Sequence, residues 1–212
     1  AGYLQDHSSH HIEVLDTQPG NLSYPALEEL LKKRKTIPEV VGITAMTFTL
    51  IDVFQLIACV KNVYPNALVV LGGPHTHIFP TETISHENVD FLVQGEGEIV
   101  FKELLDNLHD RETLESIKGL VFKDGNKVID TGIATSTENL DELGMPARNL
   151  VNVKDYSSLL GKSNVVTTMF TSRGCPYRCT FCDRPFSPVI SGFRYRSAKH
   201  VADEIEEYEC SW

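Results

Sequence analysis

The first half of the chain alternates short runs of β-branched and aliphatic residues with longer stretches in which apolar residues recur every three or four positions. The short runs are typical of buried strands, and the longer stretches are typical of helices with one apolar face. We predict strands at residues 12–15, 40–44, 68–71 and 91–93, and helices at residues 24–34, 51–63, 81–86 and 99–108. This alternation indicates an α/β fold with a doubly wound parallel sheet.

The pattern changes after residue 117. Two alternating runs surround Asp124-Gly125-Asn126 within residues 119–130, which predicts a β-hairpin appended to the first domain. Residues 132–164 have few periodic apolar positions and are predicted to be a linker. An apolar strand at 165–170, a cysteine-rich loop and a helix from Ala198, capped by Ser197, then follow. The predicted domains are therefore residues 1–131, a linker at 132–164, and residues 165–212.

One strand, one loop and one helix cannot bury their own sheet edges, so residues 165–212 are expected to be the truncated start of a larger domain. The chain also begins with Ala1 in a helix-like segment, whereas a doubly wound sheet usually opens with a strand. We therefore expect the chain to be part of a longer protein and, by itself, to be inactive.

Composition narrows the possible functions. A net charge of -10 argues against general nucleic-acid binding, which needs clustered Lys and Arg. No apolar run approaches the roughly 20 residues that cross a bilayer, so no membrane role is predicted. Five cysteines in 212 residues do not resemble a disulfide framework, which indicates a cytoplasmic, reducing setting.

Three of these cysteines, Cys175, Cys179 and Cys182, have the spacing C-x3-C-x2-C. Three thiolates leave one coordination position of a metal centre open, which favours a reactive centre over a closed structural site.

Five arginines surround the loop and could offset the negative charge of a thiolate-bound cluster, although an ordinary solvated basic surface is the alternative. They are Arg173, Arg178, Arg184, Arg194 and Arg196. A zinc site completed by His200 or Cys210 is a second alternative, but zinc frameworks favour paired C-x2-C motifs.

This loop resembles the cluster-binding motif of the radical S-adenosylmethionine (AdoMet, SAM) superfamily, with Phe181 at the aromatic position before the last cysteine. The resemblance implies a [4Fe-4S] cluster held by Cys175, Cys179 and Cys182, AdoMet on the fourth iron, and Phe181 near the adenine. It also implies formation of a 5′-deoxyadenosyl radical, chemistry that belongs to the cofactors.

The first domain resembles the cobalamin-binding domain of the B12-dependent branch of that superfamily, which is a Rossmann-like (flavodoxin-like) sheet ahead of a partial TIM barrel. The resemblance lies in residues 42–47, 72–75 and 89–98, and in residues 139–148 of the linker. It implies cobalamin contacts from residues that follow the strands, namely Thr44, Met46, Thr47, Gly72, Gly73, His75, Gly95, Glu96 and Gly97.

The residues themselves leave alternatives open. A glycine at a strand end lets the backbone approach a bulky ligand, but a Gly-Gly pair often serves only to turn the chain. His75 could bind cobalt, contact the corrin or hydrogen-bond its loop, and an Asp-x-His-x-x-Gly cobalt-ligand motif is absent. Glu96 and Glu98 could equally stabilise the start of the next helix.

These observations together predict the N-terminal part of a cobalamin-dependent radical AdoMet enzyme of the methyltransferase or oxidative cyclase type. Its expected partners are a small-molecule substrate and an electron donor such as a flavodoxin or ferredoxin, with no nucleic acid and no membrane. A cobalamin-binding module without catalysis and a zinc-stabilised structural protein are the alternatives.

Overall fold

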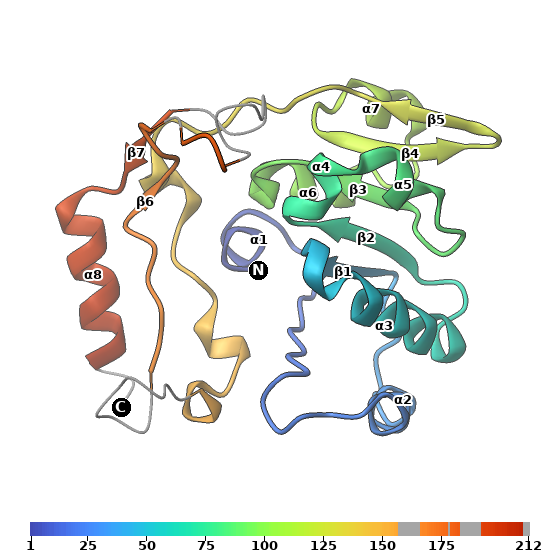
Figure 1. Cartoon of the computed structure of the whole chain (residues 1–212). Helices are drawn as coiled ribbons and strands as arrows, with labels where there is room; N and C mark the ends of the chain where they lie inside the picture. Colours follow the sequence, from blue (N-terminus) through green and yellow to red (C-terminus); the bar gives the residue numbers. More distant parts are fainter. Residues whose placement is uncertain (157–165, 178, 183–191, 210–212) are drawn as a thin grey trace. The chain divides into compact units, whose positions relative to one another are not determined.

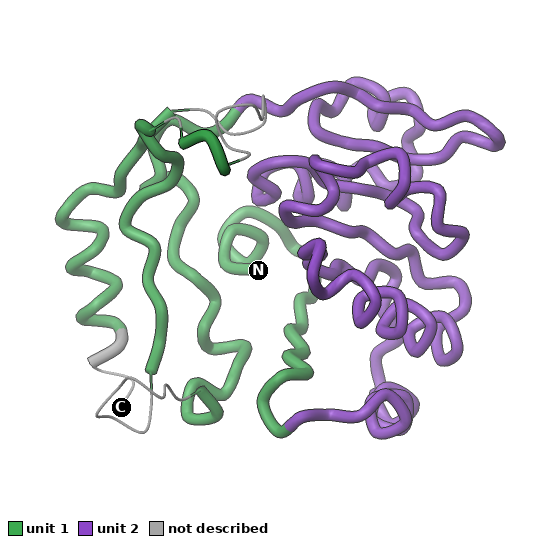
Figure 2. Tube along the Cα trace, viewed as in Figure 1, with its two compact units in different colours: residues 1–20, 136–212 green, residues 21–135 purple. Residues whose placement is uncertain are grey.

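A computed structural model describes residues 1–156, 166–177, 179–182 and 192–209. The chain divides into two compact units, one formed by residues 21–135 and the other by residues 1–20 together with 136–212 (Figure 2). Contacts thus group the first 20 residues with the C-terminal part, whereas the sequence predicted a first domain of residues 1–131. The predicted domain boundaries stay a prediction.

Residues 21–135 form a five-stranded sheet with the strands in chain order (Figure 1). Its strands are β1 (Val40–Thr44), β2 (Leu68–Gly72), β3 (Phe91–Val93), β4 (Leu120–Asp124) and β5 (Lys127–Asp130). The first three strands are parallel, and β4 and β5 are antiparallel to their neighbours. The predicted α/β fold is therefore confirmed, but the hairpin is not an appendix, because Phe122 of β4 lies opposite Phe91 of β3.

Helices cover both faces of this sheet. They are α2 (Tyr24–Lys32), α3 (Leu50–Val63), α4 (Pro74–Ile78), α5 (Pro80–Ser85), α6 (Gly97–Asp106) and α7 (Arg111–Ser116), with a short 3-10 turn, η1 (Thr47–Thr49), before α3. Val69 and Leu71 of β2 pack in one apolar cluster with Ile57 of α3, whereas Val70 packs in another with Leu104 of α6. Because successive strand residues point to opposite faces, α3 and α6 lie on opposite sides of the sheet.

A third apolar cluster joins α2 to α3 through Leu27, Leu31 and Val60. The Tyr64 hydroxyl donates a hydrogen bond of 2.5 Å to the carbonyl of Leu31, at the end of the same contact. Helix α2 is therefore held by packing on α3. None of the described helices is long and apolar enough to cross a bilayer.

The second unit contains little regular structure. Its elements are α1 (Gly2–His7), the 3-10 turns η2 (Leu140–Leu143), η3 (Arg148–Leu150) and η4 (Val153–Asp155), the short strands β6 (Ser172–Arg173) and β7 (Arg194–Tyr195), and α8 (Ala198–Glu209). Strands β6 and β7 pair antiparallel. The predicted N-cap of α8 is confirmed, because the Ser197 hydroxyl accepts a hydrogen bond of 3.1 Å from the backbone N–H of His200.

Two strand predictions were wrong. Residues 12–15 form no strand and pair with none of the described strands, so their backbone groups lack the partner that a strand needs. Residues 166–170 also form no strand, while residue 165 lies outside the described residues. Arginine side chains take the carbonyls there instead: Arg148 Nη2 donates to Thr168 O at 2.5 Å, and Arg196 Nη1 donates to Phe170 O at 3.1 Å.

Candidate functional site

The carboxyl ends of β1 and β2 are joined by backbone hydrogen bonds. Ala45 N donates to Gly72 O at 2.7 Å, and His75 N donates to Ala45 O at 3.1 Å. These bonds hold the loops that follow the two strands side by side. In parallel α/β sheets this edge is where ligands bind.

His75 joins the same two loops through its side chain. It is 2% exposed, and its Nδ1 atom lies 3.1 Å from the Thr47 hydroxyl oxygen. The Nε2 atom is buried and has no hydrogen-bond partner in the described part of the chain. Because Nδ1 is occupied and Nε2 is buried, this arrangement favours a structural role for His75 over cobalt ligation.

Gly73 brings the backbone of one loop close to the other. Its φ is +97°, and a Cβ atom at this position would lie 2.8 Å from Ala45 O and 3.0 Å from the Thr44 methyl carbon. A side chain is therefore excluded by conformation and by space. Gly95, after β3, also has a positive φ of +80°.

Two buried polar residues extend this contact to the loop after β3, and the sequence analysis missed both. The Thr76 hydroxyl oxygen lies 2.8 Å from Gly73 O and 3.1 Å from Val93 O. Gln94 Nε2 donates to Thr76 O at 3.4 Å. Their sequence signal was weak. Gln94 is a polar residue directly after a strand, where a turn explains it equally well, and Thr76 lies within the short helix α4.

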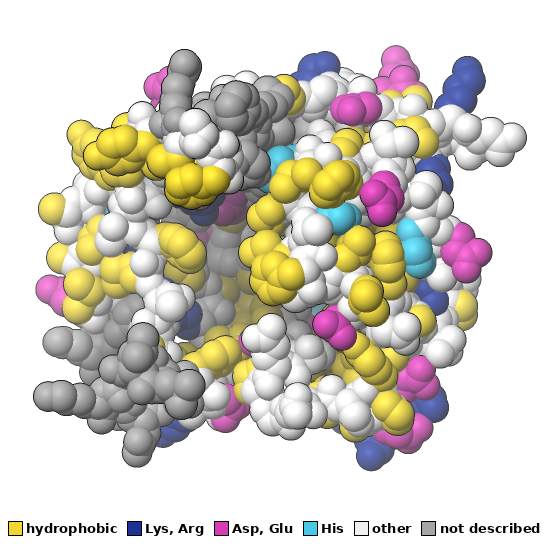
Figure 3. All heavy atoms as spheres, viewed as in Figure 1, with side chains coloured by type: hydrophobic (Ala, Val, Ile, Leu, Met, Phe, Trp, Pro, Cys, Tyr) yellow, Lys and Arg dark blue, Asp and Glu magenta, His cyan; other side chains and the backbone are white. Residues whose placement is uncertain are grey.

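Exposed apolar side chains lie next to these loops. They belong to the segment after β1, to η1, to the start of α3 and to the end of α4, and are Met46, Phe48, Ile51, Ile78 and Phe79. Phe48 is 87% exposed and Ile51 is 79% exposed. Figure 3 shows hydrophobic side chains and histidines together on the viewed face of this unit. A gathered apolar surface of this kind is typical of a ligand-binding or partner-binding site.

The sequence-predicted cobalamin contacts all lie in or beside the loops after β1, β2 and β3. The structure brings Thr47 and His75 into contact, and packs Thr44 beside Gly73. Glu96 is the N-cap residue of α6, and Glu98 lies in its first turn. Both carboxylates therefore lie at the positive end of that helix, which is the structural role that the sequence left open.

The cysteine loop lies in the other unit, between β6 and β7. Cys175 and Cys179 are exposed, Cys182 is half-buried, and all are free thiols. Gly174 precedes them with φ of +87°, and a Cβ atom there would collide with the carbonyl of Gly192. Phe181 is 92% exposed. Residues 178 and 183–191, including Arg178 and Arg184, lie outside the described residues.

The three cysteine thiols are the right chemical type for an iron–sulfur cluster, but they are not gathered around one point. Three free thiols are the soft ligands that such clusters take. Among the described residues, no three His, Cys, Asp or Glu side chains are gathered closely enough to hold a metal ion. Binding a cluster would therefore require the three thiols to move together.

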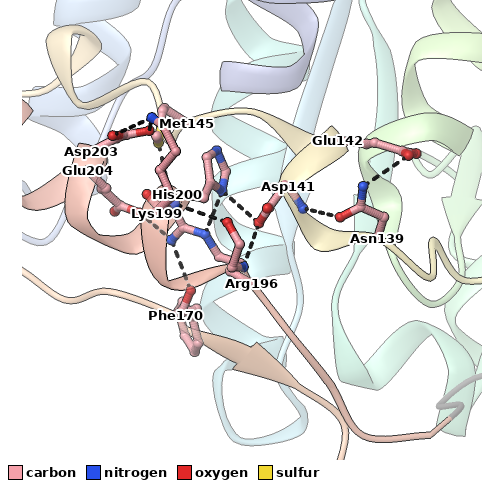
Figure 4. Close-up of polar contacts among 11 residues, drawn as sticks. Asn139, Asp141, Glu142, Met145, Phe170, Arg196, Lys199, His200, Asp203 and Glu204 are labelled. Atoms are coloured by element: carbon pink, nitrogen blue, oxygen red, sulfur yellow. Dashed lines mark hydrogen bonds and ion pairs between the residues drawn. The ribbon is translucent and has the colours of Figure 1, made fainter.

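His200, the histidine of the zinc alternative, has one ring nitrogen engaged. Its Nδ1 atom lies 3.0 Å from Arg196 Nε and 3.2 Å from Asp141 Oδ1 (Figure 4), so zinc would have to bind through Nε2. Cys210, the other candidate fourth ligand, lies outside the described residues.

Comparison with known proteins adds independent information. Residues 1–105 match the B12 binding domain family. The chain is 34% identical over 199 residues to an uncharacterised methyltransferase of Pyrococcus horikoshii, covering 92% of this chain and 42% of the relative. It is also 33% identical over 214 residues to an anaerobic magnesium-protoporphyrin IX monomethyl ester cyclase of Cereibacter sphaeroides, covering 98% of this chain and 32% of the cyclase.

Solved structures agree on the fold. The radical S-adenosylmethionine methyltransferase TsrM of Kitasatospora setae, solved with cobalamin and a [4Fe-4S] cluster, matches with a TM-score of 0.71 and 20% identity, over 99% of this chain and 41% of TsrM. The cobalamin-dependent S-adenosylmethionine radical enzyme OxsB matches with a TM-score of 0.75 and 20% identity, over 97% of this chain and 27% of OxsB. The chain thus spans less than half the length of these proteins. The chain is similar in sequence to the anaerobic magnesium-protoporphyrin cyclases and, with 31% identity over 175 residues, to the cobalamin-dependent radical SAM methyltransferase TokK of Streptomyces tokunonensis, and its first 105 residues match the B12 binding domain.

Proposed function

We propose that this chain carries the cobalamin site and the cluster site of a radical SAM enzyme that performs methyl transfer or ring formation. Cobalamin would bind at the carboxyl edge of β1, β2 and β3, and a [4Fe-4S] cluster would bind to Cys175, Cys179 and Cys182. The observation that carries the proposal is the set of three free, accessible thiols on one loop of a chain whose other unit presents a preformed strand-end surface.

The residues of the first unit would act by binding and orientation. Gly73 keeps the surface free of a side chain, and the Thr47–His75 contact holds the two loops in place. The apolar side chains of Met46, Phe48 and Phe79 would exclude water from the face of a corrin ring. No side chain in this surface is proposed as a cobalt ligand, because both ring nitrogens of His75 are buried or engaged.

The residues of the second unit would hold the cluster and AdoMet. When bound, these cofactors supply the reductive cleavage of AdoMet that starts radical chemistry. The three thiolates would hold three irons and leave the fourth for AdoMet, and the exposed ring of Phe181 would cover the adenine. An electron donor such as a flavodoxin or ferredoxin would reduce the cluster in the cytoplasm.

The test is anaerobic reconstitution of the protein with iron and sulfide in the presence of hydroxocobalamin. We expect about four irons and one cobalamin per chain, with a Mössbauer spectrum typical of a [4Fe-4S] cluster. The same preparation of the full-length protein, with AdoMet and a reductant, should yield 5′-deoxyadenosine or S-adenosylhomocysteine, whereas these 212 residues alone should yield neither. Cobalamin uptake without any cluster would favour the cobalamin-binding module, and zinc at unit stoichiometry without iron would favour a structural zinc site.

A further inference from the structure

A buried carboxylate fixes α8 within its unit. Glu204 is fully buried, and two arginines bind it from different segments. Arg148 Nη1 lies 2.6 Å from Glu204 Oε1, and Arg196 Nη1 contacts Glu204 Oε2. A buried charge is costly unless it is paired and hydrogen-bonded, so the positions of both arginines are closely defined. Figure 4 shows the contact between Arg196 and Glu204.

Arg196 also holds the chain on both sides of the cysteine loop, which we define as residues 174–193. Its backbone N–H donates to Thr171 O at 2.9 Å, and its Nη1 donates to Phe170 O at 3.1 Å. Thr171 lies three residues before the loop, and Arg196 lies three residues after it. One residue therefore ties the segment entering the loop to the segment leaving it.

The remaining donors of Arg196 attach this junction to α8 and to the segment before it. Nη2 donates to His200 O at 3.1 Å and approaches Met145 Sδ at 3.5 Å, while Nε donates to His200 Nδ1 at 3.0 Å. A planar guanidinium with five donors in a fixed geometry can make these contacts at once, and a lysine ammonium cannot.

We propose that Arg196 is a positioning residue that fixes the two ends of the cysteine loop against α8 and so sets where Cys175, Cys179 and Cys182 meet their cluster. This inference rests on the proposed function. The contacts of Arg196 are made at the base of the loop, so the thiols can still move together while the loop stays anchored. Arg196 itself touches neither the cluster nor AdoMet in this proposal.

The experiment compares Arg196→Gln and Arg196→Lys with the matched control Lys199→Gln in the reconstituted protein. Lys199 lies on α8, three residues after Arg196, and its side chain is 83% exposed in an ion pair with Asp203. Arg196→Gln and Lys199→Gln each remove one positive charge, so a long-range charge effect would appear in both. Arg196→Lys keeps the positive charge but replaces the planar guanidinium and its five donors with an ammonium group.

Three quantities are measured in each variant. They are the iron retained against a chelator, the EPR spectrum of the reduced cluster, and the hydrogen exchange of residues 166–174 in the metal-free protein.

Removing a residue that orients metal ligands typically lowers metal affinity roughly 10-fold or more, and we expect this loss for both Arg196 variants but not for Lys199→Gln. Hydrogen exchange of residues 166–174 should become faster in the same two variants. If Arg196→Gln does not fold, the conservative variant Arg196→Lys can still be compared with wild type and with Lys199→Gln.

Unchanged iron retention and unchanged exchange in both Arg196 variants would overturn the inference and leave the proposed function intact. Equal losses in Lys199→Gln would also overturn it, since charge alone would then explain the effect. A wild-type protein that takes up no cluster would overturn the proposed function and the cluster part of this inference together. Hydrogen exchange of the metal-free variants would still decide whether Arg196 fixes the loop ends.

Discussion

Among single residues, Gly73 is a position where the loops after β1 and β2 leave little room for a side chain. We predict that Gly73→Ala lowers the free energy of unfolding by about 1–3 kcal/mol more than Gly132→Ala does, as expected when extra atoms enter a packed site. Gly132 has a similar φ of +83°, but a Cβ atom there would have no neighbour within 4 Å, so the control isolates the steric part. Urea unfolding measures both variants, and equal losses would contradict the prediction.

Tyr156 offers a residue-level test of the second unit. Its hydroxyl donates a hydrogen bond of 2.7 Å to Asp16 Oδ2, and this bond raises the pKa of Tyr156 to about 12 from its usual 10.0. Because folding raises this pKa, the stabilisation is complete below pH 10 and disappears as the pH rises toward 12.

We predict that Asp16→Ala returns the ionisation of Tyr156 to near pH 10, its unperturbed range, in a spectrophotometric titration followed against Tyr156→Phe. The pKa would fall because the hydrogen bond and the nearby negative charge are both lost. Asp155→Asn is the control, because the charge of Asp155 contributes less to the shift. A Tyr156 pKa that stays near 12 in Asp16→Ala would show that the bond to Asp16 does not cause the shift.

At the scale of elements, the start of α8 depends on Asp141. Its Oδ1 atom accepts a hydrogen bond of 3.0 Å from the backbone N–H of Ser197, directly before the helix. Hydrogen bonding by Ser197, helped by the nearby charge of Arg196, lowers the pKa of Asp141. A carboxylate with a lowered pKa stabilises the folded state above its unfolded pKa, and this contribution is lost as the pH falls through the folded value.

We therefore predict that Asp141→Asn is less stable than wild type at pH 7. The difference should begin to shrink as the pH falls below about 4, the unperturbed pKa of an aspartate, and disappear below the lowered pKa of folded Asp141. Urea unfolding followed by far-UV circular dichroism at several pH values measures this. Asp203→Asn removes a carboxylate from an exposed ion pair on the same helix and serves as the control. A constant difference between wild type and Asp141→Asn at all pH values would refute the linkage.

Elements whose pattern is local could be predicted from the sequence. Strands β1, β2 and β3 are aliphatic runs bounded by turn residues, and α3 and α6 have a continuous apolar face. The strand predicted at 166–170 is absent because Arg148 and Arg196, which are distant in sequence, donate hydrogen bonds to carbonyls of this segment. The strand predicted at 12–15 was wrong because a strand needs a neighbouring strand to pair with. The local pattern of apolar and polar residues does not say whether such a neighbour exists.

The candidate site was predictable to the same extent. Glycine at strand ends and three closely spaced cysteines are visible as motifs. The contact between Thr47 and His75 is not, because it depends on the register that places Thr44 beside Gly72. Buried Thr76 and Gln94 were missed for the same reason.

For the whole molecule, the proposed cofactors belong to different units, so their binding should be separable. We predict that changing Cys175, Cys179 and Cys182 together to serine abolishes iron binding and leaves cobalamin binding intact. Iron analysis and the absorbance of cobalamin retained after gel filtration measure the two sites independently.

Cys59→Ala is the control for that experiment. Cys59 is buried in the cluster between α2 and α3, so this variant should keep both cofactors and lose only about 1 kcal/mol of stability. Loss of cobalamin together with iron in the triple variant would show that the two sites depend on each other.

One of the two edge strands of the sheet, β5, has a consequence for behaviour at high concentration. It is only four residues long, it carries Lys127 and Asp130 at its ends, and its side chains are mostly exposed. Short, charged border strands discourage sheets of different molecules from adding to one another. Replacing Lys127 and Asp130 with β-branched apolar residues is therefore expected to promote intermolecular strand pairing at β5, and so aggregation.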